Sequence, residues 1–303
     1  GAVLYAGTLP ADSFSATDTV LLGGGDAGIV RLSPDGTAVL SVTRLGQMVN
    51  DLAVSDTSGR IAVAGDFGVA VLNANASEVI WSQNIGGSEG TYVDTGNDNT
   101  VAVAHSNHVT VYDGTGQSIG DFSIGESSAF NDMAIDTGNG LVFVTGYKQR
   151  DVGGFCMGKY KAGYLRAFDY SGSIEWTNYD WTAQEVDAAG QCSDTTGRGL
   201  NLGKDGYLYY AATSDGGNTV HQNDPKDLGA AANNVKPDKY QDPWGLSGAK
   251  TIGYFARFDP GTGDHLAGSF LLTRLLSDPN AGNSVRLQVI DADGAGNVFV
   301  GGA

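Results

Sequence analysis

Short apolar runs separated by turn residues recur along the whole chain. One copy starts at Asn50-Asp51, passes a turn rich in Asp, Ser and Gly, and continues as the apolar stretch 61–65. Asn131-Asp132 opens the same pattern 81 residues later, followed by a matching apolar stretch. Runs of this length bounded by Gly, Asn and Asp are typical of β-strands joined by tight turns. Because 81 residues are two periods of about 40, the pattern predicts a repeat protein.

The repeat can be followed by aligning one strand in each copy. The aligned positions are separated by 41, 40, 41, 66 and 90 residues: Leu22, Val63, Val103, Val144, Tyr210 and Val300. Three regular intervals followed by two long ones indicate insertions of about 25 and 49 residues in the fourth and fifth copies. The matching segments predicted to be third strands are residues 28–33, 163–169 and 253–259.

Each copy is expected to form four short antiparallel strands, the usual content of a propeller blade of this length. Residues 1–303 are therefore predicted to be one all-β domain, a β-propeller of six blades, or of seven if the natural chain continues past Ala303. Residues 1–7 are expected to add a strand to the last copy and so remove open sheet edges. Almost no helix is expected outside the insertions.

Two parts of the sequence resemble known propeller families. Residues 291–301 follow the pattern Asp-x-x-Gly-Asn, then apolar residues and Gly, and this resembles the bacterial SBBP-type repeat and, more loosely, the NHL and quinoprotein-like propellers. The strings that resemble a family of secreted bacterial propeller proteins without an established activity are residues 207–220, 254–260 and 268–275. The resemblance implies a propeller fold and a setting outside the bacterial cytoplasm, and it carries no catalytic motif.

Composition and charge narrow the range of partners. With 41% hydrophobic and 17% charged residues, the chain can bury a sizeable core. Its net charge of −17 repels nucleic-acid phosphates and anionic lipids and favours divalent cations. No apolar run approaches the roughly 18 to 20 residues that a membrane helix needs. We expect neither nucleic-acid binding nor membrane insertion, and we predict a secreted or cell-surface protein. Because the chain starts and stops inside strand-like runs, we expect it to be part of a longer one.

The two cysteines, Cys156 and Cys192, both lie in polar, Gly-containing stretches. In a propeller blade, the loop between the second and third strands and the loop after the fourth strand emerge on the same face. Cys156 falls in the first of these loops and Cys192 in the second, so the two can meet. We predict a disulfide formed in an oxidising compartment; the alternative is two unrelated thiols.

Candidate chemistry in the sequence is sparse. The Gly-rich segments lie between strands rather than before a helix, which favours turns over nucleotide sites. His105 and His108 sit in a predicted hairpin with no third ligand nearby in sequence. Calcium is the more plausible ion, with Asp291, Asp293 and Asn297 as its candidate ligands. These residue types also form turns without a metal, so no cofactor is required and Ca²⁺ is only a candidate.

The insertions offer the best candidates for binding. Trp81 and Trp176 recur in equivalent fourth strands and are predicted to pack between blades. The three long segments are residues 147–162, 178–198 and 214–251, and blade connectivity predicts that they project from one face. The candidate binding residues among them are Lys159, Tyr160, Trp181, Tyr240 and Trp244. The cations predicted to accompany them are Lys148, Arg150 and Lys161. The alternative is that the insertions only cap the channel.

Two functions remain open on these observations. The first is a non-catalytic structural, assembly or adhesion module outside the cell, whose partner is a second copy of the protein, a surface protein or a surface glycan. The second is an extracellular enzyme that acts on glycans or uses a quinone-type cofactor, whose site would gather residues from separate blades. The absence of a recognisable nucleophile, base or cofactor loop in the sequence favours the first.

Overall fold

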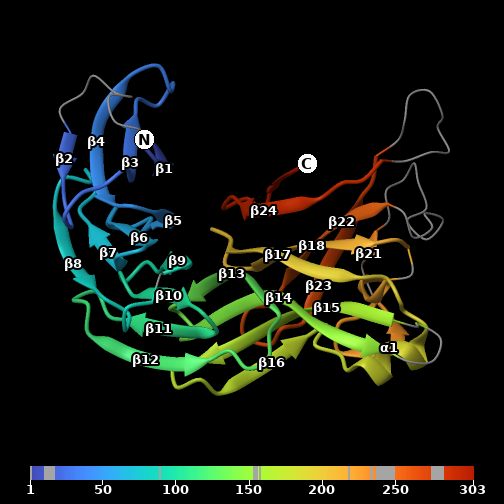
Figure 1. Cartoon of the computed structure of the whole chain (residues 1–303). Helices are drawn as coiled ribbons and strands as arrows, with labels where there is room; N and C mark the ends of the chain where they lie inside the picture. Colours follow the sequence, from blue (N-terminus) through green and yellow to red (C-terminus); the bar gives the residue numbers. More distant parts are fainter. Residues whose placement is uncertain are drawn as a thin grey trace. The chain divides into compact units, whose positions relative to one another are not determined.

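The computed structural model of the protein describes residues 2–9, 18–88, 90–152, 156, 158–217, 219–232, 235–236, 250–273 and 283–303 (Figure 1). The chain divides into two compact units. The first comprises Gly1–Ile124 with Tyr170–Gly172, and the second Gly125–Asp169 with Ser173–Ala303. Most described strands belong to four-stranded sheets whose strands are mainly antiparallel, and this all-β fold is consistent with propeller-like blades.

The first unit contains three four-stranded sheets. The first sheet has the order β1 (Val3–Thr8), β3 (Ala27–Leu32), β4 (Val39–Gly46) and β2 (Asp18–Val20). The second sheet has β5 (Val49–Val54), β6 (Ile61–Gly65), β7 (Gly68–Leu72) and β8 (Val79–Gln83). The third sheet has β9 (Tyr92–Thr95), β10 (Val101–His105), β11 (His108–Tyr112) and β12 (Ser118–Ser123).

The second unit contains the fourth and fifth sheets and two short hairpins. The fourth sheet has β13 (Ala129–Asp136), β14 (Leu141–Val152), β15 (Gly158–Asp169) and β16 (Ile174–Asn178). The fifth has β17 (Thr195–Leu202), β18 (Leu208–Asp215), β22 (Thr251–Phe258), β23 (His265–Leu271) and β21 (Val235–Lys236). The hairpins are β19 (Asn223–Asp224) with β20 (Asp227–Ala231), and β24 (Leu287–Ala292) with β25 (Val298–Gly302).

The structure confirms most of the predicted strands. The three segments predicted to be third strands coincide with β3, β15 and β22. The described helices are α1 (Ala183–Ala189) and the 3₁₀ helix η1 (Val220–Gln222), and both lie in the predicted insertions. Strands β6 and β7 are buried over their whole length, which is why the repeat shows continuous apolar runs rather than alternation.

The N-terminal part of the repeat alignment is wrong. Leu22 was aligned with second strands, but it lies in a turn with a positive φ of 50°. The second-strand position of the first sheet is taken by β1, which pairs antiparallel with β3 from Val3 opposite Leu32 to Thr8 opposite Ala27. The strand predicted to complete the last copy therefore pairs in the first sheet instead. The apolar run before Gly23 misled the alignment because short apolar runs occur in turns as well as in strands.

The recurrent Asn-Asp pair holds successive sheets together. In the first unit, Asn50 Nδ2 donates to the Gly90 carbonyl at 2.7 Å, and Asp51 Oδ2 accepts from the Val93 N–H at 2.9 Å. Asn50 is the extra residue of a bulge in β5, and this directs its side chain out of the ladder. Burial raises the pKa of Asp51 to about 6 in spite of the hydrogen bonds from Val93 and Leu52.

The second unit repeats this Asn-Asp clamp. Asn131 Nδ2 donates to the Gly197 carbonyl at 2.7 Å, and Asp132 Oδ2 accepts from the Leu200 N–H at 2.8 Å. Asn131 is again the extra residue of a bulge, here in β13. The motif from which the repeat was recognised is therefore a sheet-to-sheet contact within each unit.

Fourth strands make a second recurrent contact, with the turn between the third and fourth strands of the following sheet. A side chain on Gly116 would come within 2.8 Å of Trp81, and Gln83 Nε2 donates to the Gly116 carbonyl at 2.9 Å. Gly116 has a φ of 87°. Glycine is required there both by the indole and by the backbone conformation.

Trp176 makes the equivalent contact in the second unit. Its ring lies 2.5 Å from the position a side chain of Gly263 would take, and its Nε1 donates to the Pro260 carbonyl at 2.9 Å. Asn178 Nδ2 donates to the Gly263 carbonyl at 2.7 Å. Trp176 is 8% exposed, and Trp81 is 9% exposed. Both are packing residues, as the sequence predicted.

Replacing Asp132 by Ala is expected to lower the free energy of unfolding by about 1 to 3 kcal/mol, because the N–H groups of Met133 and Leu200 lose a partly buried acceptor. Urea unfolding followed by circular dichroism at pH 7 measures the effect. Glu175→Ala removes an exposed carboxylate in the same unit and is expected to change stability by less than about 0.5 kcal/mol. Equal midpoints for the two variants would contradict the role of the clamp.

Candidate functional site

The three insertions predicted to share one face do come together in the second unit. Strands β14 and β15 are 12 residues long, against five for β6 and β7, and their extra length reaches α1. Helix α1 also contacts β20, which belongs to the third insertion. The described parts of these segments therefore form one surface region, supported by the fourth and fifth sheets.

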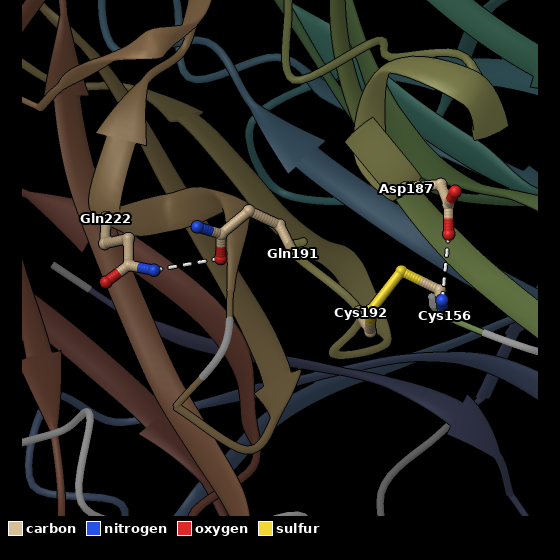
Figure 2. Close-up of a disulfide and its surroundings, with 5 residues drawn as sticks. All are labelled: Cys156, Asp187, Gln191, Cys192 and Gln222. Atoms are coloured by element: carbon tan, nitrogen blue, oxygen red, sulfur yellow. Dashed lines mark hydrogen bonds between the residues drawn. A yellow bond between two sulfur atoms is a disulfide. The ribbon is translucent and has the colours of Figure 1, made fainter. Parts of the chain in front are cut away.

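A disulfide joins the first two insertions, as predicted (Figure 2). Cys156 and Cys192 are 36 residues apart, with their Cα atoms at 5.1 Å. The Cys156 N–H donates to Asp187 Oδ1 at 2.8 Å, which ties the hairpin tip to α1 as well. Next to the bridge, Gln222 Nε2 donates to Gln191 Oε1 at 2.9 Å and links the third insertion. Closing a loop of this length stabilises the fold by roughly 3 to 4 kcal/mol in the chain-entropy model.

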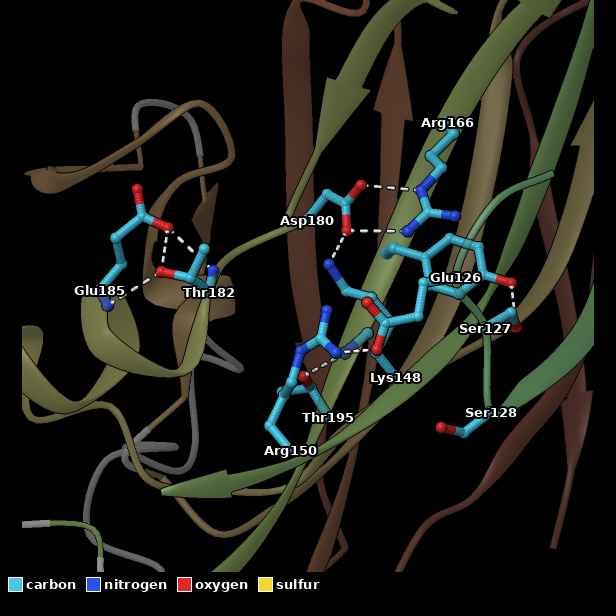
Figure 3. Close-up of polar contacts among 12 residues, drawn as sticks. Glu126, Ser127, Ser128, Lys148, Arg150, Arg166, Asp180, Thr182, Glu185 and Thr195 are labelled. Atoms are coloured by element: carbon cyan, nitrogen blue, oxygen red, sulfur yellow. Dashed lines mark hydrogen bonds and ion pairs between the residues drawn. The ribbon is translucent and has the colours of Figure 1, made fainter. Parts of the chain in front are cut away.

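Helix α1 is short, and its ends are defined by local contacts. Thr182 and Glu185 form a capping box: the Thr182 N–H donates to Glu185 Oε2 at 2.8 Å, and the Glu185 N–H donates to Thr182 Oγ1 at 3.3 Å (Figure 3). Gly190 ends the helix in the left-handed conformation, with a φ of 66°. Ala183 and Val186 are the helical residues buried against the core.

An ion-paired carboxylate holds the chain just before this helix (Figure 3). Asp180 accepts from Arg166 Nε at 2.7 Å and Nη2 at 3.1 Å, and it also pairs with Lys148. Arg166 and Lys148 are each 5% exposed. Burial alone would raise the pKa of Asp180, but the hydrogen bonds and charges of Arg166 and Lys148 outweigh it and hold the pKa below its usual range.

Beneath the insertions lies a cluster of tyrosines and histidines, buried except for the half-buried His265. Tyr254 Oη lies 3.1 Å from both Tyr179 Oη and His265 Nε2. The His221 ring stacks on Tyr254, with ring centres 4.4 Å apart, and is 0% exposed. Burial, with a smaller contribution from His265, lowers the pKa of His221 to about 3, so this imidazole is neutral at physiological pH. The cluster is out of reach of a substrate and supports the surface region from below.

A hollow of about 500 Å³ lies between α1 and β20. We call it the insertion hollow; its side chains come from Trp181, Glu185, Lys226, Asp227 and Leu228, with Ala188, Ala189 and Gly229 completing the wall. Trp181 Nε1 is shielded from solvent and has no acceptor among the described residues. Lys226 Nζ donates to Asp264 Oδ1 and to the Thr262 carbonyl, both at 2.8 Å. The hollow thus combines an aromatic ring with carboxylate acceptors.

The predicted binding residues are not all at this hollow. Trp181 lines it, and Lys159 is exposed on β15. Tyr160 is 2% exposed and belongs to the core, so it does not face a partner. Tyr240 and Trp244 lie outside the described residues.

Most of the cationic side chains predicted to accompany the binding residues interact with other residues of the protein. Lys148 is buried against Asp180, and Arg150 pairs with Glu126 (Figure 3). Lys161 Nζ lies 5.2 Å from the centre of the Tyr147 ring. Of the cations named from the sequence, Lys159 is the exposed one with no ion pair among the described residues. Linear spacing did not reveal these pairs because Asp180 and Glu126 come from other segments.

The candidate calcium ligands form a hydrogen-bonded turn. Asp293 Oδ1 accepts from the N–H groups of Ala295 and Asn297 at 2.9 Å, and Oδ2 accepts from Asn297 Nδ2 at 2.8 Å. Asp291 Oδ1 accepts from its neighbour Ala292 at 2.7 Å. Among the described residues, no group of three or more His, Cys, Asp or Glu side chains is gathered for a metal ion. Whether calcium binds stays a prediction.

The histidine pair lies in the hairpin predicted for it. His105 ends β10 and His108 begins β11, and their ring centres are 5.9 Å apart. His105 Nε2 lies 3.0 Å from Thr110 Oγ1. Burial lowers the pKa of His105.

Three polar residues of the insertion hollow were not predicted from the sequence: Glu185, Lys226 and Asp227. One local signal was available, since Thr182-x-x-Glu185 is the pattern of a capping box and marks the start of a helix. Lys226 and Asp227 follow Pro225 in a polar stretch with no comparable pattern. Their position beside α1 is set by tertiary packing.

Replacing Asp180 by Asn is expected to lower the free energy of unfolding by about 3 kcal/mol at pH 7, because two buried cations lose their counter-charge. Since folding lowers the pKa of Asp180, its stabilisation is full above pH 4 and is lost as the pH falls through the folded pKa. The difference between parent and variant, measured by urea unfolding, should therefore shrink below pH 4. Glu126→Gln, at the 61% exposed partner of Arg150, is the control and should cost less than about 1 kcal/mol. A difference independent of pH would contradict this account.

Removing divalent cations with EDTA is expected to leave the melting temperature unchanged, because the Asp293 carboxylate already accepts hydrogen bonds from its own turn. Differential scanning calorimetry in EDTA and in millimolar CaCl₂ measures this. A site with a Kd one hundred times below the calcium concentration would stabilise the fold by about 2.7 kcal/mol. A rise of that size, lost in Asp293→Asn, would identify a calcium site and refute the expectation.

The comparisons with known proteins bear on the fold alone. No protein-family model matches the chain, and no curated protein matches it in sequence. Among solved structures, hydrazine synthase of Kuenenia stuttgartiensis is similar with a TM-score of 0.56 and 12% identity, over 96% of this chain and 76% of that one. U3-55K is similar with a TM-score of 0.53 and 10% identity, over 99% of this chain and 77% of that one. No helix among the described residues is long and apolar enough to cross a membrane.

Proposed function

We propose that this protein is a secreted bacterial β-propeller, of the type that resembles SBBP and NHL repeats, and that it acts as a non-catalytic binding module for surface glycans. The sheets would be its blades, six in number, and the insertion hollow its binding site. No cofactor is needed for this role. The disulfide supports a place outside the cytoplasm, where such bonds persist.

The observation that carries the proposal is the way in which Trp181 is held. Its neighbour Asp180 is fixed by Arg166 and Lys148, and its other neighbour, Thr182, is the N-cap of α1 (Figure 3). The backbone N–H of Trp181 donates to the Tyr179 carbonyl at 2.9 Å. A ring positioned from both sides loses little conformational entropy on binding, which favours affinity.

The chemistry of the hollow suits a sugar with many hydroxyl groups. An indole presents an apolar surface to the C–H groups of a sugar ring. The carboxylates of Glu185 and Asp227 line the same hollow and can accept hydrogen bonds from hydroxyls. Because these acceptors are negative and Lys226 is paired with Asp264, a neutral glycan fits better than an acidic one.

Binding also fits this site better than glycan cleavage. A general acid at neutral pH needs a carboxyl whose pKa is raised. Hydrogen bonds from the backbone N–H and then the hydroxyl of Thr182 instead hold the pKa of Glu185 below its usual range. An ionised Glu185 is an acceptor and a cap for α1, not a proton donor.

Trp181→Ala is expected to weaken binding of neutral oligosaccharides at least tenfold, as measured on a glycan array and then by calorimetry with the best probe. Phe299→Ala is the matched control, because Phe299 is a 58% exposed aromatic residue of the same unit outside the hollow. Circular dichroism checks that both variants fold. Full binding by Trp181→Ala would refute the site. Binding of no glycan, together with self-association of the parent chain in ultracentrifugation, would favour assembly instead.

A further inference from the structure

The second unit has another cavity, separate from the insertion hollow and built by the fifth sheet and the C-terminal hairpin. It has a volume of about 560 Å³, within the range of small-molecule sites. We call it the arginine cavity. The side chains that matter for its chemistry are Tyr209, Phe255, Arg257, Leu266, Ala267 and Val298.

The fifth sheet lacks an indole that two other sheets carry at the position lining this cavity. In the second sheet Val71 stands opposite Trp81, in the fourth Ala167 stands opposite Trp176, and each pair is followed at once by a bulge. In the fifth sheet the pair before the equivalent bulge is Arg257 opposite Ala267, and in the first sheet it is Arg31 opposite Ser41. A methyl group therefore replaces the indole, and an arginine replaces a small apolar residue on the partner strand.

Arg257 brings an unused donor into this space. Its Nε is shielded from solvent and has no hydrogen-bond acceptor among the described residues. Its guanidinium carbon lies 4.7 Å from the centre of the Tyr207 ring, which holds the group flat against an aromatic face. A buried donor without a partner is costly, and a guanidinium edge matches the two oxygens of a carboxylate.

Tyr209 and Asp205 lie beside the Arg257 guanidinium, and Tyr209 forms a side-chain hydrogen bond with it. Tyr209 Oη donates to Asp205 Oδ2 at 2.7 Å, so this carboxylate oxygen is already engaged. The position that a Gly296 side chain would take lies 3.2 Å from Asp205 Oδ2 and 3.8 Å from Arg257 Nη1. Asp205 is thus near the Nη1 end of the guanidinium, and glycine at 296 keeps that end of the cavity open.

We propose that the arginine cavity binds a small organic acid with an apolar body. The carboxylate pairs with the guanidinium of Arg257, and the body packs against Phe255, Leu266 and Val298. Ala267 provides the room that an indole fills in the second and fourth sheets. This site is independent of glycan binding at the insertion hollow.

Ligand-observed NMR on the unmodified chain tests the proposal with cinnamate and its neutral analogue cinnamide. Cinnamate is expected to bind at least tenfold more tightly, because its carboxylate can take both hydrogen bonds of a guanidinium edge as a charged acceptor. Equal affinities for the two probes, or no detectable binding of cinnamate at millimolar concentration, would overturn the proposal.

Variants then locate the site. Arg257→Gln should weaken cinnamate binding at least tenfold and leave cinnamide unaffected. Ala267→Trp, which introduces the residue of the second and fourth sheets, should abolish the binding of both probes by filling the cavity. Arg286→Gln removes an exposed arginine of the same unit and should change neither affinity. Circular dichroism checks folding, and unchanged cinnamate binding in folded Arg257→Gln or Ala267→Trp would place the acid elsewhere and refute the assignment.

Discussion

The rest of this structure depends on the burial of both faces of each central strand pair against neighbouring sheets. Every residue of β6 and β7 is buried, and small side chains such as Ala62, Ala64 and Ala70 let the sheets approach closely. Apolar contact is non-directional, so by itself it would allow one sheet to slide over the next. The Asn-Asp clamps remove this freedom, because each joins one N–H and one C=O of the following sheet. Apolar packing thus stabilises the fold, and the two hydrogen bonds of each clamp fix the position of one sheet against the next.

The insertions rely on this support. Strands β14 and β15 continue past the length of a regular strand and carry the first insertion on a paired ladder from Leu141 opposite Asp169 to Val152 opposite Gly158. The disulfide, the capping box of α1 and the Asp180 ion pairs then fix three separate points of the surface region. A binding residue that extends from such a framework is positioned before its ligand arrives, whereas the same residue on an isolated loop would have to be ordered on binding.

Much of the fold could be predicted from the sequence because the apolar positions of each repeat are also the buried positions of the structure. Continuous apolar runs located the central strands, and the equivalent positions of Trp81 and Trp176 identified them as packing residues. The disulfide followed from loop connectivity. The failures were of two kinds. The sequence predicts a strand at Leu22 because an apolar run in a turn looks the same as an apolar run in a strand. Only the pairing of β1 with β3 shows which of the two segments is the strand.

The second kind of failure concerns side chains that depend on distant partners. The sequence shows Lys148 and Arg150 as free cations, but their partners, Asp180 and Glu126, are 32 and 24 residues away. The sequence predicts Tyr160 to be a binding residue of an insertion, yet its strand directs that side chain into the core. In each case the residue types in the segment are those that the binding hypothesis needs. The spacing of residues along the chain does not show which way each side chain points.

The fifth sheet lacks both of the recurrent contacts between sheets, the Asn-Asp clamp and the fourth-strand indole. Its first strand carries Arg198-Gly199 at the bulge, where the second and fourth sheets have Asn-Asp. A side chain at Gly199 would lie 3.2 Å from the Gln288 carbonyl, so β24 approaches closely at the position where a clamp residue would otherwise stand. The same sheet replaces the fourth-strand indole by Ala267. The third sheet also has neither contact, because its first strand has no bulge and its fourth strand carries Gly120 where the indole would stand. Loss of the clamp and the indole therefore does not by itself mark a binding sheet. In the fifth sheet the space beside Ala267 belongs to a cavity that Arg257 also lines, and this cavity supports the proposed acid site.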